Sequence, residues 1–416
     1  MTTTNSEKAT LEKTVEVEGH LIDSMILTKI FDEIMDQRGD FEVLEFRIGK
    51  RKEDHSYVKL IVKGRDEEHL DSLMKDLYRL GAMPLEDLNV KLVKAPADKI
   101  LPDDFYSTTS HFTLIRLNGA WIEVGDIMMD KAIIVDLDEN TAKCKPMRQV
   151  KKGELVVVGD AGIQVRLPSR PREGTGIFNF MTSQSSTEKP SISIVKRIAE
   201  EIVNAKSKGE KIAVVAGPAV VHTKAAPSLA RMIQLGYVDV LLSGNALAVH
   251  DVEYAILGTS LGVNLENGSS TLRGNRNHIA AINEVNKAGS LRDMVKKGTL
   301  KSGIIYECVT NNVPFALAGS IRDDGPLPEV ITDTVKAQEE YHALLKDADL
   351  VIMMASMLHS IAVGNLLPSA VKTICIDINP MALTKLMDRG TAQALGIISD
   401  IGALLPLLVQ EIERLQ

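Results

Sequence analysis

Six short, mostly apolar runs divide the second half of the chain at helix-length intervals. Each run ends abruptly in small, polar or acidic residues; the runs are 212–216, 238–242, 314–318, 350–354, 373–376 and 395–398. Continuous apolar runs of this length are typical of parallel strands, because crossover helices cover both faces of the sheet. Helical periodicity fills the intervals at 191–207, 225–235 and 333–346, and again at 401–415. We therefore predict an α/β fold with a doubly wound parallel sheet over residues 191–416.

The front of the chain shows two other patterns. Residues 15–97 contain an alternating strand, an amphipathic helix at 24–36, a hairpin at 41–62 and a second helix at 66–80. This βαββα order predicts a ferredoxin-like α+β module. Residues 98–167 contain short strands separated by turns rich in Gly, Asp and Asn, which predicts a small antiparallel or barrel-like β-rich unit.

Two remaining segments have the composition of connections. Residues 1–14 form a polar tail, and residues 168–190 are rich in Pro, Gly, Ser and Thr, which is typical of a linker or a substrate loop. At 416 residues the chain is too long for one ordinary core, so more than one domain is expected.

Charge and cysteine content exclude several classes of function. A formal net charge of −8 provides no basic field for a nucleic acid backbone, so we expect a small-molecule substrate. The longest apolar stretch, 350–364, is interrupted by Ser356, His359 and Ser360, so no membrane segment is expected. The three cysteines lack the spacing of a zinc site or a disulfide framework. We expect a cytoplasmic protein with no metal site.

Several strand ends carry residues suited to a nucleotide, although the GxGxxG dinucleotide fingerprint is absent. Gly217-Pro218-Ala219 could bring backbone amides close to a pyrophosphate, or could simply form a tight strand-to-helix turn. Asp377 could accept hydrogen bonds from both hydroxyls of a ribose, or could initiate the turn at Pro380. Asp400 repeats this arrangement one strand later, where a helix N-cap is the alternative.

Two further strand ends supply polar groups. Asn245 and the segment Ser356–His359 offer amides, a carboxamide and a hydroxyl that suit a nicotinamide amide and phosphate oxygens. A helix cap is the alternative role of Asn245. The open α/β sheet binds its ligands at this edge, so these residues are expected to converge.

Long strings of residues identify a family resemblance. The segments 217–223, 243–253, 318–326 and 375–380 resemble the archaeal-type ornithine cyclodeaminases, also called the LOR/SDH conserved-region family, which occur fused to arginine dihydrolase in cyanobacteria. The front half contributes the segments 105–111 and 147–153 to this resemblance. It covers nearly the whole chain.

The resemblance implies an NAD-binding Rossmann-type domain similar to that of deoxyhypusine synthase. It also implies conversion of L-ornithine to L-proline and ammonia, with bound NAD recycled and no net redox change. Carried over by motif, the cofactor contacts are Asn245, Ala246, Asp324, Ser356, Met357, Leu358, His359, Asp377, Asp400 and Ile401. A shift of one residue would place the contact of the 318–326 segment on Asp323 instead.

This chemistry requires a cation for the substrate carboxylate, an acid/base for the amines and a carboxylate for the distal ammonium. The candidates near the strand ends are Lys224, Asp251 and Glu253, with His222 beside the first of them. Asp251 and Glu253 are two residues apart, so on a helix they point in different directions and at most one faces the substrate. A solvated or capping role is the alternative for each.

Two other functions are consistent with the same residues. An NAD-dependent amino-acid dehydrogenase or imine reductase of the saccharopine or lysine-ketoglutarate type would use the same cofactor but release NADH. An NAD-sensing regulatory module would bind the cofactor without turnover, and its front module would sense an amino acid. In each case we expect a homo-oligomer, either a dimer or a tetramer.

Overall fold

The computed structural model describes residues 11–22, 25–51, 54–84, 88–166, 192–265, 275–323, 325–388 and 394–416. It divides into two compact units: unit 1 comprises residues 1–174 with 368–370, and unit 2 comprises 175–367 with 371–416. The expected linker, residues 168–190, lies outside the described residues, as does most of the expected polar tail.

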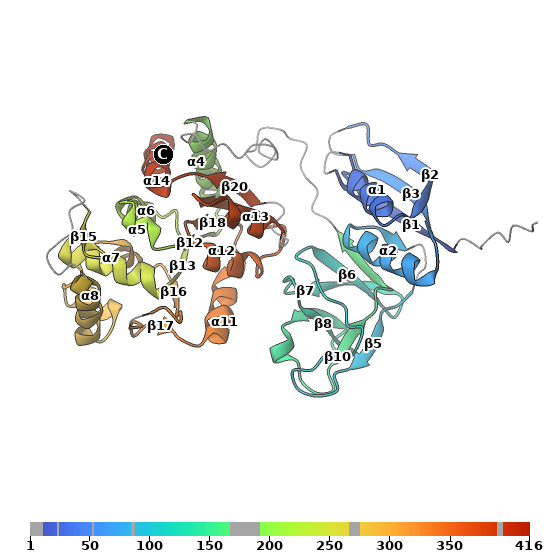
Figure 1. The fold of residues 1–416 in the computed structure, drawn as a ribbon, viewed down its shortest axis with the longest axis horizontal. Helices are drawn as coiled ribbons and strands as arrows, with labels where there is room; N and C mark the ends of the chain where they lie inside the picture. The colour runs from blue at the N-terminus through green and yellow to red at the C-terminus, as the bar shows by residue number, and fades with distance from the viewer. Residues whose placement is uncertain are drawn as a thin grey trace, which may run out of the picture. The chain divides into compact units, whose positions relative to one another are not determined.

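The first sheet of unit 1 has the order β2-β3-β1-β4, and all its pairings are antiparallel (Figure 1). Its elements are β1 (Leu11–Gly19), α1 (Ile26–Asp36), β2 (Asp40–Arg47), β3 (Ser56–Gly64), α2 (Glu67–Arg79) and β4 (Met83–Pro84). One face of the sheet and the inner faces of the two helices bury a common core that includes Val15, Ile30 and Leu73. The element order βαββαβ is that of a ferredoxin-like module.

The second sheet of unit 1 has seven strands in the order β11-β6-β7-β9-β8-β10-β5. The strands are β5 (Lys91–Lys94), β6 (Phe112–Leu117), β7 (Ala120–Gly125), β8 (Ala132–Asp136), β9 (Thr141–Lys145), β10 (Leu155–Val158) and β11 (Ile163–Arg166). All neighbours are antiparallel except β7 and β9. The strand β5 belongs to this second sheet, although it lies within residues 15–97, the range expected for the module. The domain boundaries stay a prediction.

Unit 2 is built on a seven-stranded parallel sheet of order β17-β16-β13-β12-β18-β19-β20. Its strands are β12 (Ile212–Ala216), β13 (Val240–Gly244), β16 (Phe315–Ala318), β17 (Val330–Ile331), β18 (Leu350–Met354), β19 (Lys372–Asp377) and β20 (Ala394–Ile398). The predicted fold class, α/β with a Rossmann-type parallel sheet, is confirmed. A two-stranded sheet, β14 (Thr259–Ser260) and β15 (Val263–Asn264), lies outside it.

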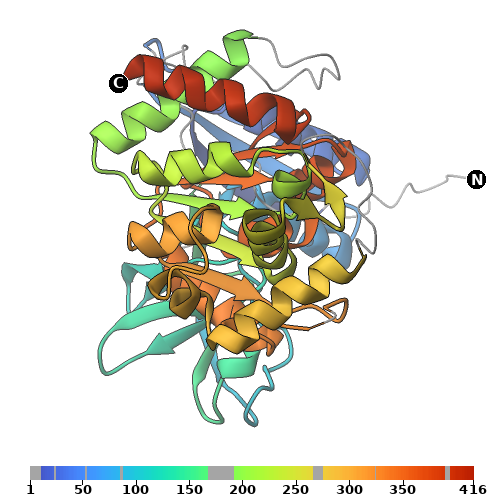
Figure 2. The same cartoon turned by 90° about the vertical axis from the view of Figure 1, so that its left-hand side faces the viewer.

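Helices cover the sheet of unit 2. They are α4 (Ile192–Ser207), α5 (Ala219–His222), α6 (Ala226–Gln234), α7 (Asn245–Leu257), α8 (Asn275–Ala288), α9 (Leu291–Lys296), α10 (Ile304–Thr310), α11 (Thr334–Leu345), α12 (Met357–Gly364), α13 (Pro380–Asp388) and α14 (Ile401–Leu415). Helices α4 and α14 lie side by side (Figure 2) and share a buried core with β12 and β18. Helices α7 to α10 bury a second core with β16 and β17.

The strand predicted at 238–242 begins at Val240 in the structure, as β13, because the side chain of Asp239 contacts the start of β12. The carboxylate of Asp239 accepts a hydrogen bond from the N–H of Ile212 at 2.9 Å and forms an ion pair with Lys206 at 2.7 Å, which fixes the start of β12.

Among the described residues, no helix is both long and apolar enough to span a bilayer.

The strand order defines where a ligand is expected. The chain runs from β12 to β13, β16 and β17 on one side, then returns to β18, β19 and β20 on the other side of β12. The connections that leave the carboxyl ends of β12 and β18 therefore run toward opposite edges of the sheet. In open α/β sheets, the crevice at the carboxyl ends of such diverging strands is the usual ligand site.

Candidate active site

A cavity of about 700 Å³ lies at this edge of the sheet in unit 2. Residues at the carboxyl ends of β12, β13, β16 and β18 line it, together with residues of α7 and α8. The lining residues are Pro218, His222, Gly244, Asn245, Ala246, His250, Leu261, His278, Ile279, Ala318, Ser320, Arg322, Asp323, Ala355, Ser356, Met357, Leu358 and His359. The volume is in the range of small-molecule sites.

Two helices begin at the cavity. Helix α7 follows directly on Gly244 and α12 follows on Ser356, and among the described side chains none caps either N-terminus. The hydroxyl of Ser356 is instead hydrogen-bonded to Nδ1 of His359 at 2.9 Å. The first N–H groups of both helices are therefore available to a ligand, and the positive ends of the helix dipoles favour an anion.

Close backbone packing holds these helix ends together. A Cβ at Gly217 would overlap the carbonyl oxygen of Ala355, so only glycine lets the end of β12 approach the turn after β18. A Cβ at Gly244 would lie 2.8 Å from the ring of His359. Asn245 fixes the other side of the cavity, because its Oδ1 accepts the N–H of Leu327 at 3.1 Å.

Three histidines from separate helices form what we call the histidine cluster: His222, His250 and His278. The rings of His222 and His250 have centroids 4.5 Å apart, and those of His250 and His278 are 4.8 Å apart. Nδ1 of His222 is hydrogen-bonded to the hydroxyl of Ser260 at 2.7 Å. Burial, together with the neighbouring imidazoles, lowers the pKa of His222 to about 4, so this ring is neutral at neutral pH.

Glu253 lies behind this cluster and is fully buried. Its carboxylate accepts hydrogen bonds from the Thr259 hydroxyl at 2.8 Å and from the N–H groups of Gly262 at 2.9 Å and Leu261 at 3.0 Å. Burial alone would raise the pKa of Glu253, but these bonds and His250 together hold the pKa below its usual value.

The ionised Glu253 determines the tautomer of His250. Oε2 of Glu253 lies 3.4 Å from Nδ1 of His250, and a carboxylate can only accept. A neutral His250 ring that donates to this carboxylate has its proton on Nδ1 and its lone pair on Nε2. His250 lines the cavity and Glu253 does not, so the pair places an imidazole at the cavity with a carboxylate behind it.

The structure brings together six of the ten predicted cofactor contacts. Asn245, Ala246, Ser356, Met357, Leu358 and His359 all line the cavity. Asp324 lies outside the described residues, but its neighbour Asp323 is a lining residue. Asp377, Asp400 and Ile401 stand at the carboxyl ends of β19 and β20 and are not among the lining residues.

Asp377 and Asp400 also perform the alternative roles considered for them. Oδ1 of Asp377 accepts the N–H of Asn379 at 2.8 Å, which forms the turn before α13. Oδ1 of Asp400 accepts the N–H of Gly402 at 2.9 Å and caps α14. Each carboxylate retains a second oxygen, so these bonds are compatible with a ligand hydroxyl.

None of the three predicted catalytic residues lines the described part of the cavity. Lys224 follows α5 with a positive φ of 65° and is exposed. Asp251 points away from the cavity, where its two oxygens accept the N–H groups of Ile304 at 2.9 Å and Ile305 at 2.8 Å and so begin α10. Glu253 contacts His250 at 3.4 Å, and its catalytic role stays a prediction. The expectation that Asp251 and Glu253 point in different directions agrees with these contacts.

Sequence reasoning missed His250 and His278 as site residues. The i,i+3 spacing of His250 and Glu253 on one helix was an available signal for a carboxylate–histidine pair. His278 lies on α8, and its approach to α7 depends on tertiary packing that no local pattern encodes.

A structural role for Asp251 makes a prediction about pH. Burial raises the pKa of Asp251 to about 6, although the hydrogen bonds from Ile305 and Ile304 lower it. Between about pH 4 and pH 6 the folded chain then retains a proton that the unfolded chain has released, so stability falls as the pH rises. This loss in the free energy of unfolding is complete above pH 6 and amounts to about 1–3 kcal/mol.

Asp251→Asn should remove this pH dependence while leaving one N–H of α10 without an acceptor. We expect the thermal midpoint of the variant to change less than that of the wild type between pH 4.5 and pH 7, with turnover retained. Calorimetry at both pH values checks this. Loss of turnover at unchanged stability would return Asp251 to the catalytic residues.

Three family models match consecutive parts of the chain. The LOR/SDH bifunctional enzyme conserved region matches residues 12–111. The first region of the C-terminal part of arginine dihydrolase ArgZ-like proteins matches 112–195, and the Rossmann fold of that part matches 196–408. An ornithine cyclodeaminase of Methanopyrus kandleri is 56% identical over 405 residues, which are 97% of this chain and 98% of that protein. The chain belongs to the ornithine cyclodeaminase family.

Solved structures agree with membership of the ornithine cyclodeaminase family. The crystal structure of a conserved LOR/SDH protein from Methanococcus maripaludis has 49% identity and a TM-score of 0.74, and the match covers 79% of this chain and 99% of that one. The ternary complex of AgrE with ornithine and NAD⁺ has 40% identity and a TM-score of 0.53, covering 98% of this chain and 58% of that longer protein. The family resemblance carried by the sequence strings is thereby confirmed.

Proposed function

We propose that this chain converts L-ornithine to L-proline and ammonia with NAD as a recycled cofactor and no net redox change. The observation that carries the proposal is the cavity itself, which joins two helix N-termini suited to an anion with a histidine held by a buried carboxylate. The M. kandleri relative, an ornithine cyclodeaminase matched over almost its whole length, supports the same activity. The AgrE complex with ornithine and NAD⁺ supports the substrate and the cofactor.

The residues at the sheet edge fit a dinucleotide. The N–H groups at the starts of α7 and α12 suit a pyrophosphate, and the second oxygen of Asp377 suits a ribose hydroxyl. The proposed cofactor residues are Asn245, Ala246, Asp323 or Asp324, Ser356, Met357, Leu358, His359, Asp377, Asp400 and Ile401. When bound, NAD accepts a hydride from the substrate α-carbon and later returns it.

His250 is the proposed catalytic acid/base. The α-amine must lose a proton before its α-carbon can be oxidised, and Nε2 of His250 can accept that proton. Attack of the distal amine on the resulting imine expels the α-nitrogen, and the protonated His250 can return the proton to this leaving group. One ammonia is lost and the ring closes through the distal nitrogen, so the atoms of ornithine balance those of proline and ammonia.

Arg322 is the one lysine or arginine among the described lining residues, and we assign it to the substrate carboxylate. It takes the role that the sequence suggested for Lys224. We expect Arg322→Met to raise KM for L-ornithine by about tenfold with kcat nearly unchanged. Steady-state kinetics at saturating NAD check this assignment, and an unchanged KM would refute it.

The activity is tested by mixing the purified chain with L-ornithine and a trace of NAD. We expect proline and ammonia in a 1:1 ratio, without accumulation of free NADH at 340 nm. Accumulating NADH would instead support an amino-acid dehydrogenase or imine reductase. Tight NAD binding without turnover of ornithine or another basic amino acid would support a regulatory module.

The site also permits a prediction about metals. The metal-binding atoms of His250, Glu253 and His278 lie within 4.8 Å of one another, which raises the question of a bound cation. The carboxylate of Glu253 has about four acceptor positions, and four donors already occupy them. We therefore expect activity to survive dialysis against EDTA unchanged. Loss of activity that Zn²⁺ or Co²⁺ restores would contradict this view of Glu253.

Two further properties belong to the proposal. The three cysteines, Cys144, Cys308 and Cys375, are free and buried, which suits a reducing cytoplasm. A homodimer or tetramer is proposed on the symmetry of most soluble oligomers, and light scattering of the purified chain tests it. A monomer at micromolar concentration would exclude both.

A further inference from the structure

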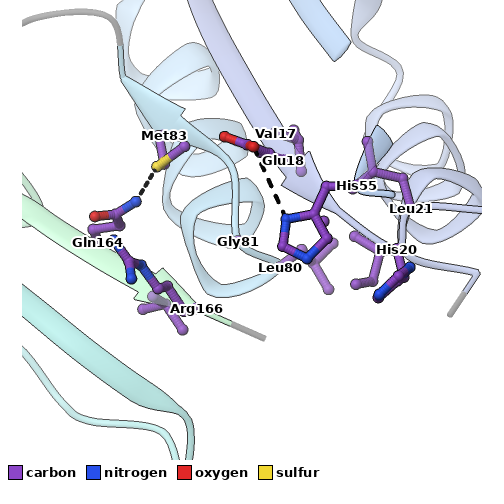
Figure 3. A pocket seen from close by; sticks show the side chains of 13 residues that line it. Val17, Glu18, His20, Leu21, His55, Leu80, Gly81, Met83, Gln164 and Arg166 are labelled. Atoms are coloured by element: carbon purple, nitrogen blue, oxygen red, sulfur yellow. Dashed lines mark hydrogen bonds and ion pairs between the residues drawn. The ribbon is translucent and has the colours of Figure 1, made fainter. Parts of the chain in front are cut away.

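Unit 1 contains a second pocket, of about 300 Å³, between its two sheets (Figure 3). One wall comes from the end of β1, the turn after it, the residue His55 and the end of α2. The opposite wall comes from Gln164 and Arg166 of β11. Nε2 of Gln164 donates a hydrogen bond to the sulfur of Met83 at 2.6 Å, which connects the two walls.

The two walls carry opposite charges. Arg166 provides a guanidinium on one wall, and Glu18 provides a carboxylate on the other, with His55 at 3.9 Å from it. The carbon of the Arg166 guanidinium lies 5.9 Å from the centroid of the Phe112 ring. Val17, Leu21, Ile26 and Leu80 give the pocket an apolar part, and the buried His20 also lines it.

We propose that this pocket binds a free L-α-amino acid. A planar guanidinium is suited to bidentate binding of a carboxylate, and Glu18 is suited to an ammonium. A ligand that carries both charges can pair with both walls, whereas a simple anion or cation can pair with only one. A volume of about 300 Å³ is at the lower end for small-molecule sites, which suits an amino acid.

A ligand of this pocket would be held entirely by residues of unit 1. The pocket shares no lining residue with the cavity in unit 2. The ligand would bridge β1 and α2 of the first sheet to β11 of the second, and thereby stabilise their packing. The inference rests on the geometry of unit 1 and goes beyond the proposed activity.

The test is calorimetric titration of the full chain, without NAD, with L-arginine and L-proline as probes. Arg322→Met should bind either amino acid as the wild type does, because its altered site lies in unit 2. Arg166→Met and Glu18→Gln should bind about tenfold more weakly or worse, since each loses a charge-assisted contact. Arg47→Met is the matched control, an exposed arginine of unit 1 outside the pocket, and should bind normally.

Agmatine, which is arginine without its carboxylate, should not bind. The proposal is overturned if agmatine binds as well as L-arginine, if Arg166→Met binds like the wild type, or if neither amino acid binds. Binding lost only in Arg322→Met would place the ligand in unit 2 and also overturn the proposal. The titration measures binding and not turnover. Failure of this proposal is therefore distinguishable from failure of the proposed activity, which the assay of proline and ammonia tests.

Discussion

His250→Gln is expected to lower kcat for proline formation by about 10²–10⁴-fold, the usual contribution of a general acid/base. The carboxamide keeps the approximate volume of the ring but cannot accept and return a proton at the position of Nε2. NAD affinity should stay within about twofold, because the helix N-termini assigned to the cofactor are untouched. Quantifying proline under single-turnover conditions and measuring the dissociation constant of NAD check both expectations.

The matched control is His342→Gln, a histidine on α11 of the same unit outside the cavity, which should keep full activity. Glu253→Gln should lower kcat less than His250→Gln does. Loss of the negative charge beside the imidazole disfavours its protonation, so the acidic limb of the rate profile should move to lower pH. A merely structural role for Glu253 would leave that limb in place. Full activity of His250→Gln would remove His250 from the mechanism.

Gly217→Ala is expected to give the second large effect, a loss of NAD affinity of roughly tenfold or more. The new methyl group would overlap the carbonyl of Ala355 and displace the turn that begins α12. Overpacking of this kind costs about 1–3 kcal/mol, so the thermal midpoint should also fall. Titration with NAD and scanning calorimetry measure the two effects.

A milder variant keeps this prediction testable if Gly217→Ala fails to fold. In Gly244→Ala the clash is with the side chain of His359, which can turn away, so the fold should survive while NAD binds more weakly. Gly125→Ala is the control, because its methyl group would make only ordinary contacts at 3.7 Å and beyond. Wild-type NAD affinity in folded Gly217→Ala would contradict the placement of the cofactor at this edge.

The parallel sheet was predictable from the sequence because strands buried on both faces appear as continuous apolar runs. Runs such as 212–216 and 350–354 agree with β12 and β18 residue for residue. Strand β17 was missed, since two residues, Val330 and Ile331, are too short to show a period. Its pairing with β16 is a tertiary contact that only the folded sheet reveals.

The site was predictable only where it consists of strand ends. Asn245 and Ser356–His359 follow their strands directly, so the topology alone brings them to one edge. For Asp251 the local sequence could not distinguish two roles, because a carboxylate near a strand end looks the same whether it faces a substrate or accepts the N–H groups of a helix. The hydrogen-bond partners of Asp251 in the structure, Ile304 and Ile305, lie more than fifty residues away in the sequence.

The most direct test of the account uses L-ornithine carrying deuterium at the α-carbon, with NAD present in an amount far below that of the substrate. Because the hydride removed from the α-carbon is returned within the same site, we predict that the L-proline formed retains deuterium at its α-carbon and that free NADH does not accumulate. Proline that has lost the label, or label that accumulates in free reduced cofactor, would contradict the claim that the cavity in unit 2 performs a closed, redox-neutral cyclodeamination.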